Sequence, residues 1–154
     1  MQESLAESLH VQRPAIKSRW ADLLHVEGAT TPLAHPDALV HLLDETLDKI
    51  FEALRAPLID DELSTASAAA PRPRCECGRN PFLQFYVAGE RALLEALILA
   101  QAELLPCDAQ TRDLAVLELY RVVRRFARGD VSVFCSVCQY AASHQRESPL
   151  VSAG

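Results

Sequence analysis

Residues 80–104 read NPFLQFYVAGERALLEALILAQAEL, and this stretch decides the fold. Asparagine is a good N-cap and proline is favoured at the first helical position, so Asn80 and Pro81 mark the start of a helix. Because the apolar face that follows is wide, we predict that this helix is central in an all-α protein. The apolar residues at helical spacing are Leu83, Tyr86, Val87, Leu93, Leu94, Leu97, Ile98 and Leu104.

Three further helices are predicted from the rest of the chain. One begins near Pro14 and ends at Gly28, and the next runs from Pro36 to Ala56. The last follows Asp108, a good N-cap, and is expected to break at Gly129. Four helices with mostly short connections predict an antiparallel four-helix bundle. We expect its core to contain Trp20, Leu43, Leu47, Val87, Leu94, Leu97, Tyr120, Val123 and Phe126.

The composition is that of one globular domain over residues 1–154. Hydrophobic residues make up 49% of the chain and charged residues 23%, and 154 residues are enough for one hydrophobic core. Residues 57–74 are rich in small residues and proline, which predicts a linker. Residues 1–12 and 141–154 are expected to be disordered tails.

Charge and hydropathy exclude several classes of partner. The net charge of −6 argues against a nucleic-acid binder, which is normally basic. The first residues, MQESLAESLH, are acidic and unlike a secretory leader, and the apolar runs are too short to cross a bilayer. We therefore expect a cytoplasmic protein that binds neither nucleic acid nor membrane. In a reducing compartment, close cysteine pairs indicate metal or redox chemistry rather than structural disulfides.

Four of the five cysteines stand in two close pairs, within RCECGRN and FCSVCQY. Each pair lies about thirty residues from the turn that joins the last two helices, and each residue adds 1.5 Å of helix, so antiparallel packing brings both pairs to one end of the hairpin. Four thiolates in a tetrahedron form a structural zinc site. We therefore predict a Zn²⁺ site at this end, held by Cys75, Cys77, Cys135 and Cys138. Cys107 falls in the turn at the opposite end and is expected to be a free thiol.

Other interpretations of the cysteines stay open. A CxxC pair can cycle between dithiol and disulfide, so a thiol redox sensor or oxidoreductase is the alternative function. An iron–sulfur cluster also takes four cysteines, and small buried residues without any ligand are a further possibility. Because no pattern marks a catalytic nucleophile, the preferred function is non-enzymatic. It is a zinc-stabilised regulatory or interaction module that binds another protein or forms a dimer.

Four arginines make a basic stripe on the last predicted helix, because they recur at the spacing i, i+3, i+4 and i+7; they are Arg121, Arg124, Arg125 and Arg128. The functional hypothesis is a binding surface for an acidic partner or a phosphate. The interpretation that we favour is a solvated face that pairs with the acidic helix over residues 36–56. Glu90, within the apolar face of the central helix, is expected to pair with an arginine.

The segment AIKSRWADLL at residues 15–24, followed by acidic and apolar helices, resembles the N-terminal helical sensor domains of RsbR-type stressosome co-antagonists. The resemblance covers the first two predicted helices and rests mainly on Trp20 and its apolar neighbours. It implies a bacterial helical bundle linked to stress signalling. No functional residue is carried over from that family.

Overall fold

The computed structural model describes residues 1–26, 39–56, 72–75, 80–103 and 108–138. Across these ranges the secondary structure is helical and no strand is present, so the predicted all-α class is confirmed. The helices are α1 (Glu3–Val11), α2 (Arg13–Val26), α4 (Leu43–Arg55), α6 (Pro81–Glu103) and α7 (Ala109–Val137). None of these described helices combines the length and the apolar character needed to span a lipid bilayer.

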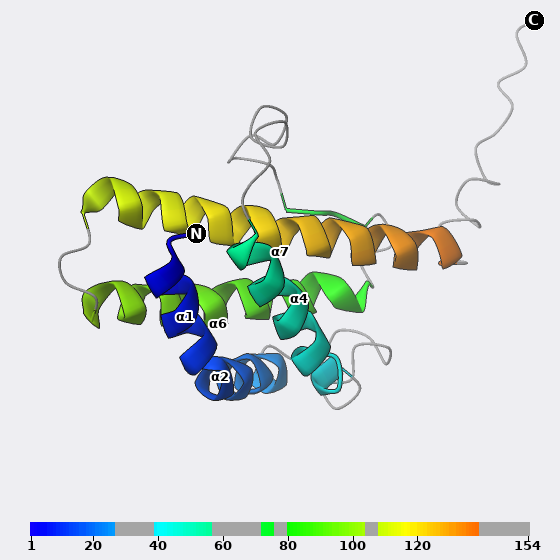
Figure 1. Cartoon of the computed structure of the whole chain (residues 1–154). Helices are drawn as coiled ribbons and strands as arrows, with labels where there is room; N and C mark the ends of the chain where they lie inside the picture. Colours follow the sequence, from blue (N-terminus) through cyan, green and yellow to red (C-terminus); the bar gives the residue numbers. More distant parts are fainter. Residues whose placement is uncertain (27–38, 57–71, 76–79, 104–107, 139–154) are drawn as a thin grey trace, which may run out of the picture.

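The long antiparallel hairpin of α6 and α7 is the frame of the molecule, and the other helices pack across it (Figure 1). α1 and α2 lie against α6, whereas α4 lies against α7 and also contacts α1 and α2. The last turns of α7 extend beyond the start of α6 (Figure 1). The hairpin therefore has one end where α6 begins and α7 ends.

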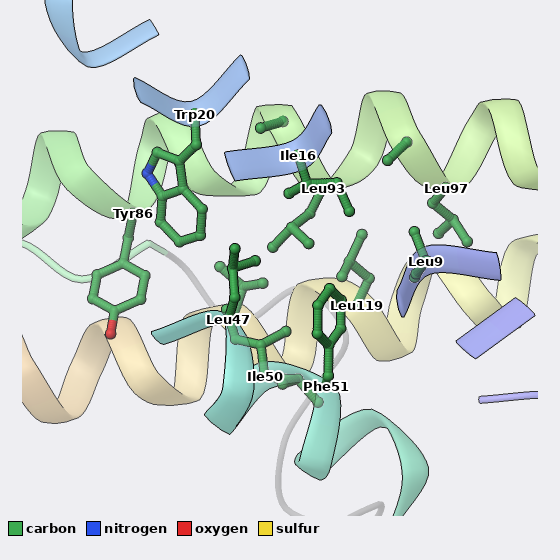
Figure 2. Close-up of a cluster of buried hydrophobic side chains, with 14 of the residues drawn as sticks. Leu9, Ile16, Trp20, Leu47, Ile50, Phe51, Tyr86, Leu93, Leu97 and Leu119 are labelled. Carbon is green, nitrogen blue, oxygen red and sulfur yellow. The ribbon is translucent and has the colours of Figure 1, made fainter. Parts of the chain in front are cut away.

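The core lies where side chains from all five described helices meet (Figure 2). Its centre includes Leu9, Ile16, Leu47, Ile50, Leu93, Leu97 and Leu119, each of which is at most 1% exposed. Trp20, Leu43, Leu47, Leu97 and Val123 are buried, as predicted. Val87, Leu94, Tyr120 and Phe126 are only partly buried, so their predicted place in the core is corrected.

Small residues explain why the buried face of α6 differs from the predicted one. Ala88, Ala92, Ala96 and Ala100 recur every four positions and are at most 6% exposed. Residues four apart share one helix face, and small side chains allow neighbouring helices to pack closely against it. Because α6 is packed against α1, α2 and α7, its buried face combines these alanines with large side chains such as Phe85, Leu93 and Leu97.

Trp20 is the main contact between α2 and α6. Its side chain is 0% exposed, and its Nε1 donates a hydrogen bond to the backbone oxygen of Phe85 at 2.9 Å. The ring lies directly over Gly89: a Cβ atom built there would be 2.5 Å from the ring atoms Cε2 and Cη2. Glycine at this position therefore allows the indole to pack against the helix backbone.

The predicted disordered tail over residues 1–12 is wrong for residues 3–11, which form α1. Leu5 and Leu9 lie four positions apart and are 1% and 0% exposed, because the core covers this face of the short helix. The described residues thus hold five helices where the sequence predicted four. The tail over residues 141–154 and most of the linker over residues 57–74 lie outside the described residues.

The last helix begins as predicted but does not break where expected. Asp108 caps α7, since its Oδ1 accepts a hydrogen bond from the Thr111 backbone N–H at 2.9 Å. The helix then continues through Gly129 to Val137. A single glycine costs a helix interior only about 1 kcal/mol, and the Asp130 carboxylate here accepts a hydrogen bond from the Tyr86 hydroxyl at 2.5 Å. A contact between helices thus holds the segment helical.

Candidate functional site

Two cysteines that are 60 positions apart in the sequence meet at the end of the hairpin. Cys75 lies in the segment 72–75 that leads toward α6, and Cys135 lies in the last turn of α7. Their Sγ atoms are 3.0 Å apart. Both side chains are half-buried. The structure therefore brings together one member of each predicted pair, at the end of the hairpin where the sequence placed them.

Asn80 fixes the geometry around these thiols. Its Oδ1 accepts a hydrogen bond from the Phe82 backbone N–H at 3.0 Å, which makes it the predicted N-cap of α6. Its Nδ2 donates to the Val131 backbone oxygen at 3.2 Å and lies 3.6 Å from the Sγ of Cys135. The residue is only 5% exposed. One side chain thus joins the start of α6 to the end of α7.

An aromatic contact supports the same end of the hairpin. The rings of Phe82 on α6 and Phe134 on α7 pack edge to face, with their centroids 6.4 Å apart. Phe134 precedes Cys135 directly. The aromatic pair and the Asn80 hydrogen bonds together hold the last turns of α7 against α6.

Of the two remaining predicted zinc ligands, the structure describes Cys138 and not Cys77. Cys138 is the C-cap of α7, where its backbone N–H donates to the Cys135 oxygen at 3.3 Å. Cys77 and Cys107 lie outside the described residues. Within the described ranges, no three side chains of His, Cys, Asp or Glu form a group that could hold a metal ion.

Replacing Asn80 with alanine should lower the free energy of unfolding by about 2 kcal/mol, because the helix cap and a buried hydrogen bond are both lost. We expect a larger effect than for Asp108→Ala, which removes an exposed cap at the other end of the hairpin. Urea unfolding followed by circular dichroism measures both variants. Equal losses would mean that the bond from Asn80 to α7 contributes nothing.

The basic stripe on α7 does not have the partner that we favoured. Two acidic residues of α4 pair instead with α2: Asp44 binds Lys17 at 2.5 Å, and Arg13 binds both Asp44 and Asp48. Glu45 pairs with Lys49 within α4. The Lys17 ammonium also holds the pKa of Asp44 below its usual range. The prediction that the stripe pairs with the helix over residues 36–56 is therefore wrong for these carboxylates.

The four arginines of the stripe have different surroundings. Arg124 is bound to Glu90, with Nη2 3.2 Å from Oε1, which confirms the predicted arginine partner of Glu90. The Arg124 guanidinium also lies 4.6 Å from the centre of the Tyr120 ring. Arg125 covers the Phe126 ring, and Arg128 donates to the Arg124 backbone oxygen. The buried Nε of Arg121 has no hydrogen-bond partner in the part of the chain that the structure describes.

Comparison with known proteins adds no relative from which a function can be transferred. No family model, no curated protein and no solved structure matches the chain. The function therefore has to be argued from the geometry of these residues.

Proposed function

We propose that the hairpin end holds one Zn²⁺ through Cys75, Cys77, Cys135 and Cys138, and that the protein is a non-enzymatic regulatory or interaction module. The observation that carries the proposal is the Sγ–Sγ distance of 3.0 Å between Cys75 and Cys135. Two thiols from distant segments at one place are the start of a sulfur-rich site, and zinc favours thiolate ligands. The wider fold, a bundle with this metal centre at one end, belongs to the same proposal.

The other two ligands are within reach of this pair. Cys77 is two residues from Cys75, and two residues of extended chain span at most about 7 Å. Cys138 is three residues from Cys135 and lies at the end of α7, where the helix no longer fixes the backbone. Sulfur atoms at about 2.3 Å from a shared zinc ion are farther apart than 3.0 Å, so metal binding would separate Cys75 from Cys135 slightly.

A metal at this position would clamp the hairpin. It would link the segment 72–75 to the last turn of α7 and add to the contacts made by Asn80 and by the Phe82–Phe134 pair. Such a crosslink stabilises a protein mainly because it removes conformational freedom from the unfolded chain. A stable hairpin then offers its outer surface to a protein partner or to a second copy of the chain.

Apolar side chains on that outer surface support an interaction role. Ile98 and Leu99 on α6 and Leu114, Val133 and Val137 on α7 are all more than half exposed. A protein partner or a second copy of the chain would remove these side chains from water. The resemblance of residues 15–24 to RsbR-type sensor domains fits such a regulatory role, and a position within stress signalling stays part of this proposal.

Metal content and thermal stability of cysteine variants test the zinc proposal. The parent protein, purified with a reductant and without added metal, should contain one zinc ion per chain, measured by inductively coupled plasma mass spectrometry. Cys75→Ser and Cys135→Ser should each lose the zinc and about 2 kcal/mol of stability, which lowers Tm by roughly 4–8 °C. Cys107→Ser is the matched control and should change neither. A metal-free parent whose variants melt like it would overturn the proposal.

The same sulfur contact also favours a second candidate, a thiol redox switch. The Sγ atoms of Cys75 and Cys135 touch, and a disulfide requires them to close to about 2.05 Å. The two thiols would lose two protons and two electrons to a peroxide, which is reduced to water or an alcohol and water. A metal-free parent that forms a Cys75–Cys135 disulfide with peroxide, detected by mass spectrometry of peptides, would support this candidate in place of zinc.

A further inference from the structure

A cavity of about 180 Å³ lies between the segment 72–75 and the two helices of the hairpin. Much of its wall is apolar: Leu83 and Val87 are four residues apart on one face of α6, and Pro73 and Ala127 close it from the segment and from α7. The volume equals about six water molecules in the liquid. The cavity is therefore suited to a ligand of a few carbon atoms rather than to a larger cofactor.

The polar part of the wall is a buried carboxylate between two arginines. The Glu90 side chain is 7% exposed, and its Oε1 accepts hydrogen bonds from Arg72 at 2.9 Å and from Arg124 at 3.2 Å. The Arg124 Nε also donates to its Oε2 at 3.3 Å. A buried carboxylate needs such partners, and two guanidinium groups stand beside the Glu90 carboxylate in the same wall.

Two further groups near the cavity are a neutral phenol and a hydrogen-bonded carboxylate. Tyr86, which also lines the cavity, donates a hydrogen bond from its hydroxyl group to the Asp130 carboxylate. Burial raises the pKa of Tyr86 well above its usual range, so the phenol stays neutral. Asp130 is an acidic neighbour of Tyr86 on α7, and its carboxylate accepts this hydrogen bond. On the same helix, Arg121 and Arg128 stand one turn before and one turn after Arg124. Arg124 is thus the member of the basic stripe that lines the cavity, and its two neighbours lie on the same face of α7.

The segment that closes the cavity is held at two points. Arg72 is bound to Glu90, and Cys75 contacts Cys135. Pro73 lies between these two points and is part of the wall. The Arg72 side chain is 58% exposed, and Arg124 binds both oxygens of Glu90, so Glu90 keeps a partner if the Arg72 guanidinium turns toward a ligand.

We propose that this cavity binds a small monocarboxylate, whose short apolar chain packs on Leu83, Val87 and Ala127 and whose carboxylate is bound by Arg72 and Arg124. Arginine binds a carboxylate through two parallel N–H donors, and this geometry matches the planar carboxylate group. The apolar wall selects a carboxylate with a hydrocarbon chain over inorganic phosphate. The proposal does not depend on whether the cysteines bind zinc.

Isothermal titration calorimetry of the full chain with butyrate tests the proposal, with butyramide as the uncharged analogue of the same shape. Because so small a ligand has few contacts, we expect a millimolar Kd for butyrate. Butyramide should bind about tenfold more weakly, since it lacks the charge that the two arginines recognise. Phosphate should bind more weakly than butyrate, because it makes no use of the apolar wall.

Two variants locate the binding site. Arg72→Gln should weaken butyrate binding about tenfold and leave butyramide unchanged, since the cavity stays intact. Arg74→Gln is the matched control, because Arg74 is exposed in the same segment and does not line the cavity. Val87→Phe should abolish binding of both molecules, because the larger ring fills the cavity from its half-buried rim.

The results separate the proposal from its competitors. Equal affinity for butyrate and butyramide would overturn the role of the arginines. Butyrate binding that persists in Val87→Phe, or that falls equally in Arg72→Gln and Arg74→Gln, would place the ligand elsewhere and overturn the site. A parent protein that gives no heat with butyrate at concentrations well above millimolar would overturn the proposal as a whole.

Discussion

Replacing Gly89 with alanine should lower the free energy of unfolding by about 3 kcal/mol, although alanine is the better helix former. A Cβ atom at this position would lie 2.5 Å from two atoms of the Trp20 ring, far inside van der Waals contact. The ring is held by its hydrogen bond to Phe85 and is fully buried, so it has no space into which to move. Urea unfolding monitored by circular dichroism measures the loss.

Gly129→Ala is the matched control for this substitution. Gly129 also lies inside a helix, α7, but a Cβ atom built there meets nothing within 4 Å. The same change should therefore stabilise the protein by about 0.5–1 kcal/mol, because alanine restricts the unfolded chain and suits a helix. If both glycine variants lost stability equally, steric contact with Trp20 would not be the cause of the loss at Gly89.

Trp20→Ala should lower the free energy of unfolding by about 4 kcal/mol, the largest loss that we expect from a single substitution in this chain. The substitution leaves a cavity between α2 and α6, and it removes the hydrogen bond from Nε1 to the Phe85 oxygen. It also removes the contact with the Phe85 ring, whose centroid is 4.8 Å from that of the indole. The same unfolding measurement gives the loss, and a value below about 1 kcal/mol would contradict the central place of Trp20.

The double variant tests whether the stability losses at Gly89 and at Trp20 have the same physical cause. Once the indole is absent, the methyl group of Gly89→Ala has no ring to meet, and it fills part of the space that the indole occupied. Adding Gly89→Ala to Trp20→Ala should therefore cost nothing or restore up to about 1 kcal/mol. Losses that simply add in the double variant would show that Gly89 and Trp20 act independently.

Local sequence patterns predicted those parts of the fold that depend on local chemistry. Asn80 and Asp108 cap their helices, and Trp20 is buried, as their neighbours in the sequence indicated. The meeting of Cys75 with Cys135 was also predictable, because two helices of similar length in a hairpin return the chain to its starting point.

Features that depend on contacts between helices were missed. The face of α6 was assigned from its large side chains; Tyr86, Leu93 and Leu97 are buried, but the buried alanines at positions 88, 92, 96 and 100 were not included. α1 was missed because its apolar face is only Leu5, Ala6 and Leu9, which is too short a pattern without a core to cover it. Gly129 was taken as a break because the contact of Asp130 with Tyr86 is not visible in the sequence.

In the candidate sites too, sequence patterns predicted some features, whereas contacts between distant segments were missed. The cysteine pairs and the arginine stripe are sequence patterns, and in the structure Cys75 meets Cys135 and Arg124 binds Glu90. No local signal announced that Asn80 would reach α7, or that Arg72 would bind Glu90 eighteen positions away. Partners such as these follow from the three-dimensional path of the chain and have no fixed spacing.

The close packing of Trp20 on Gly89 also means that the fluorescence of the protein's own tryptophan reports on this contact. The chain contains a single tryptophan, so its indole emission comes from one place, the contact between α2 and the hairpin. In the native state the indole is shielded from water, and its emission should lie at short wavelength. During unfolding, a shift of the tryptophan emission to longer wavelength would show that α2 has separated from α6. The α6–α7 hairpin could at that point still give a helical circular dichroism signal.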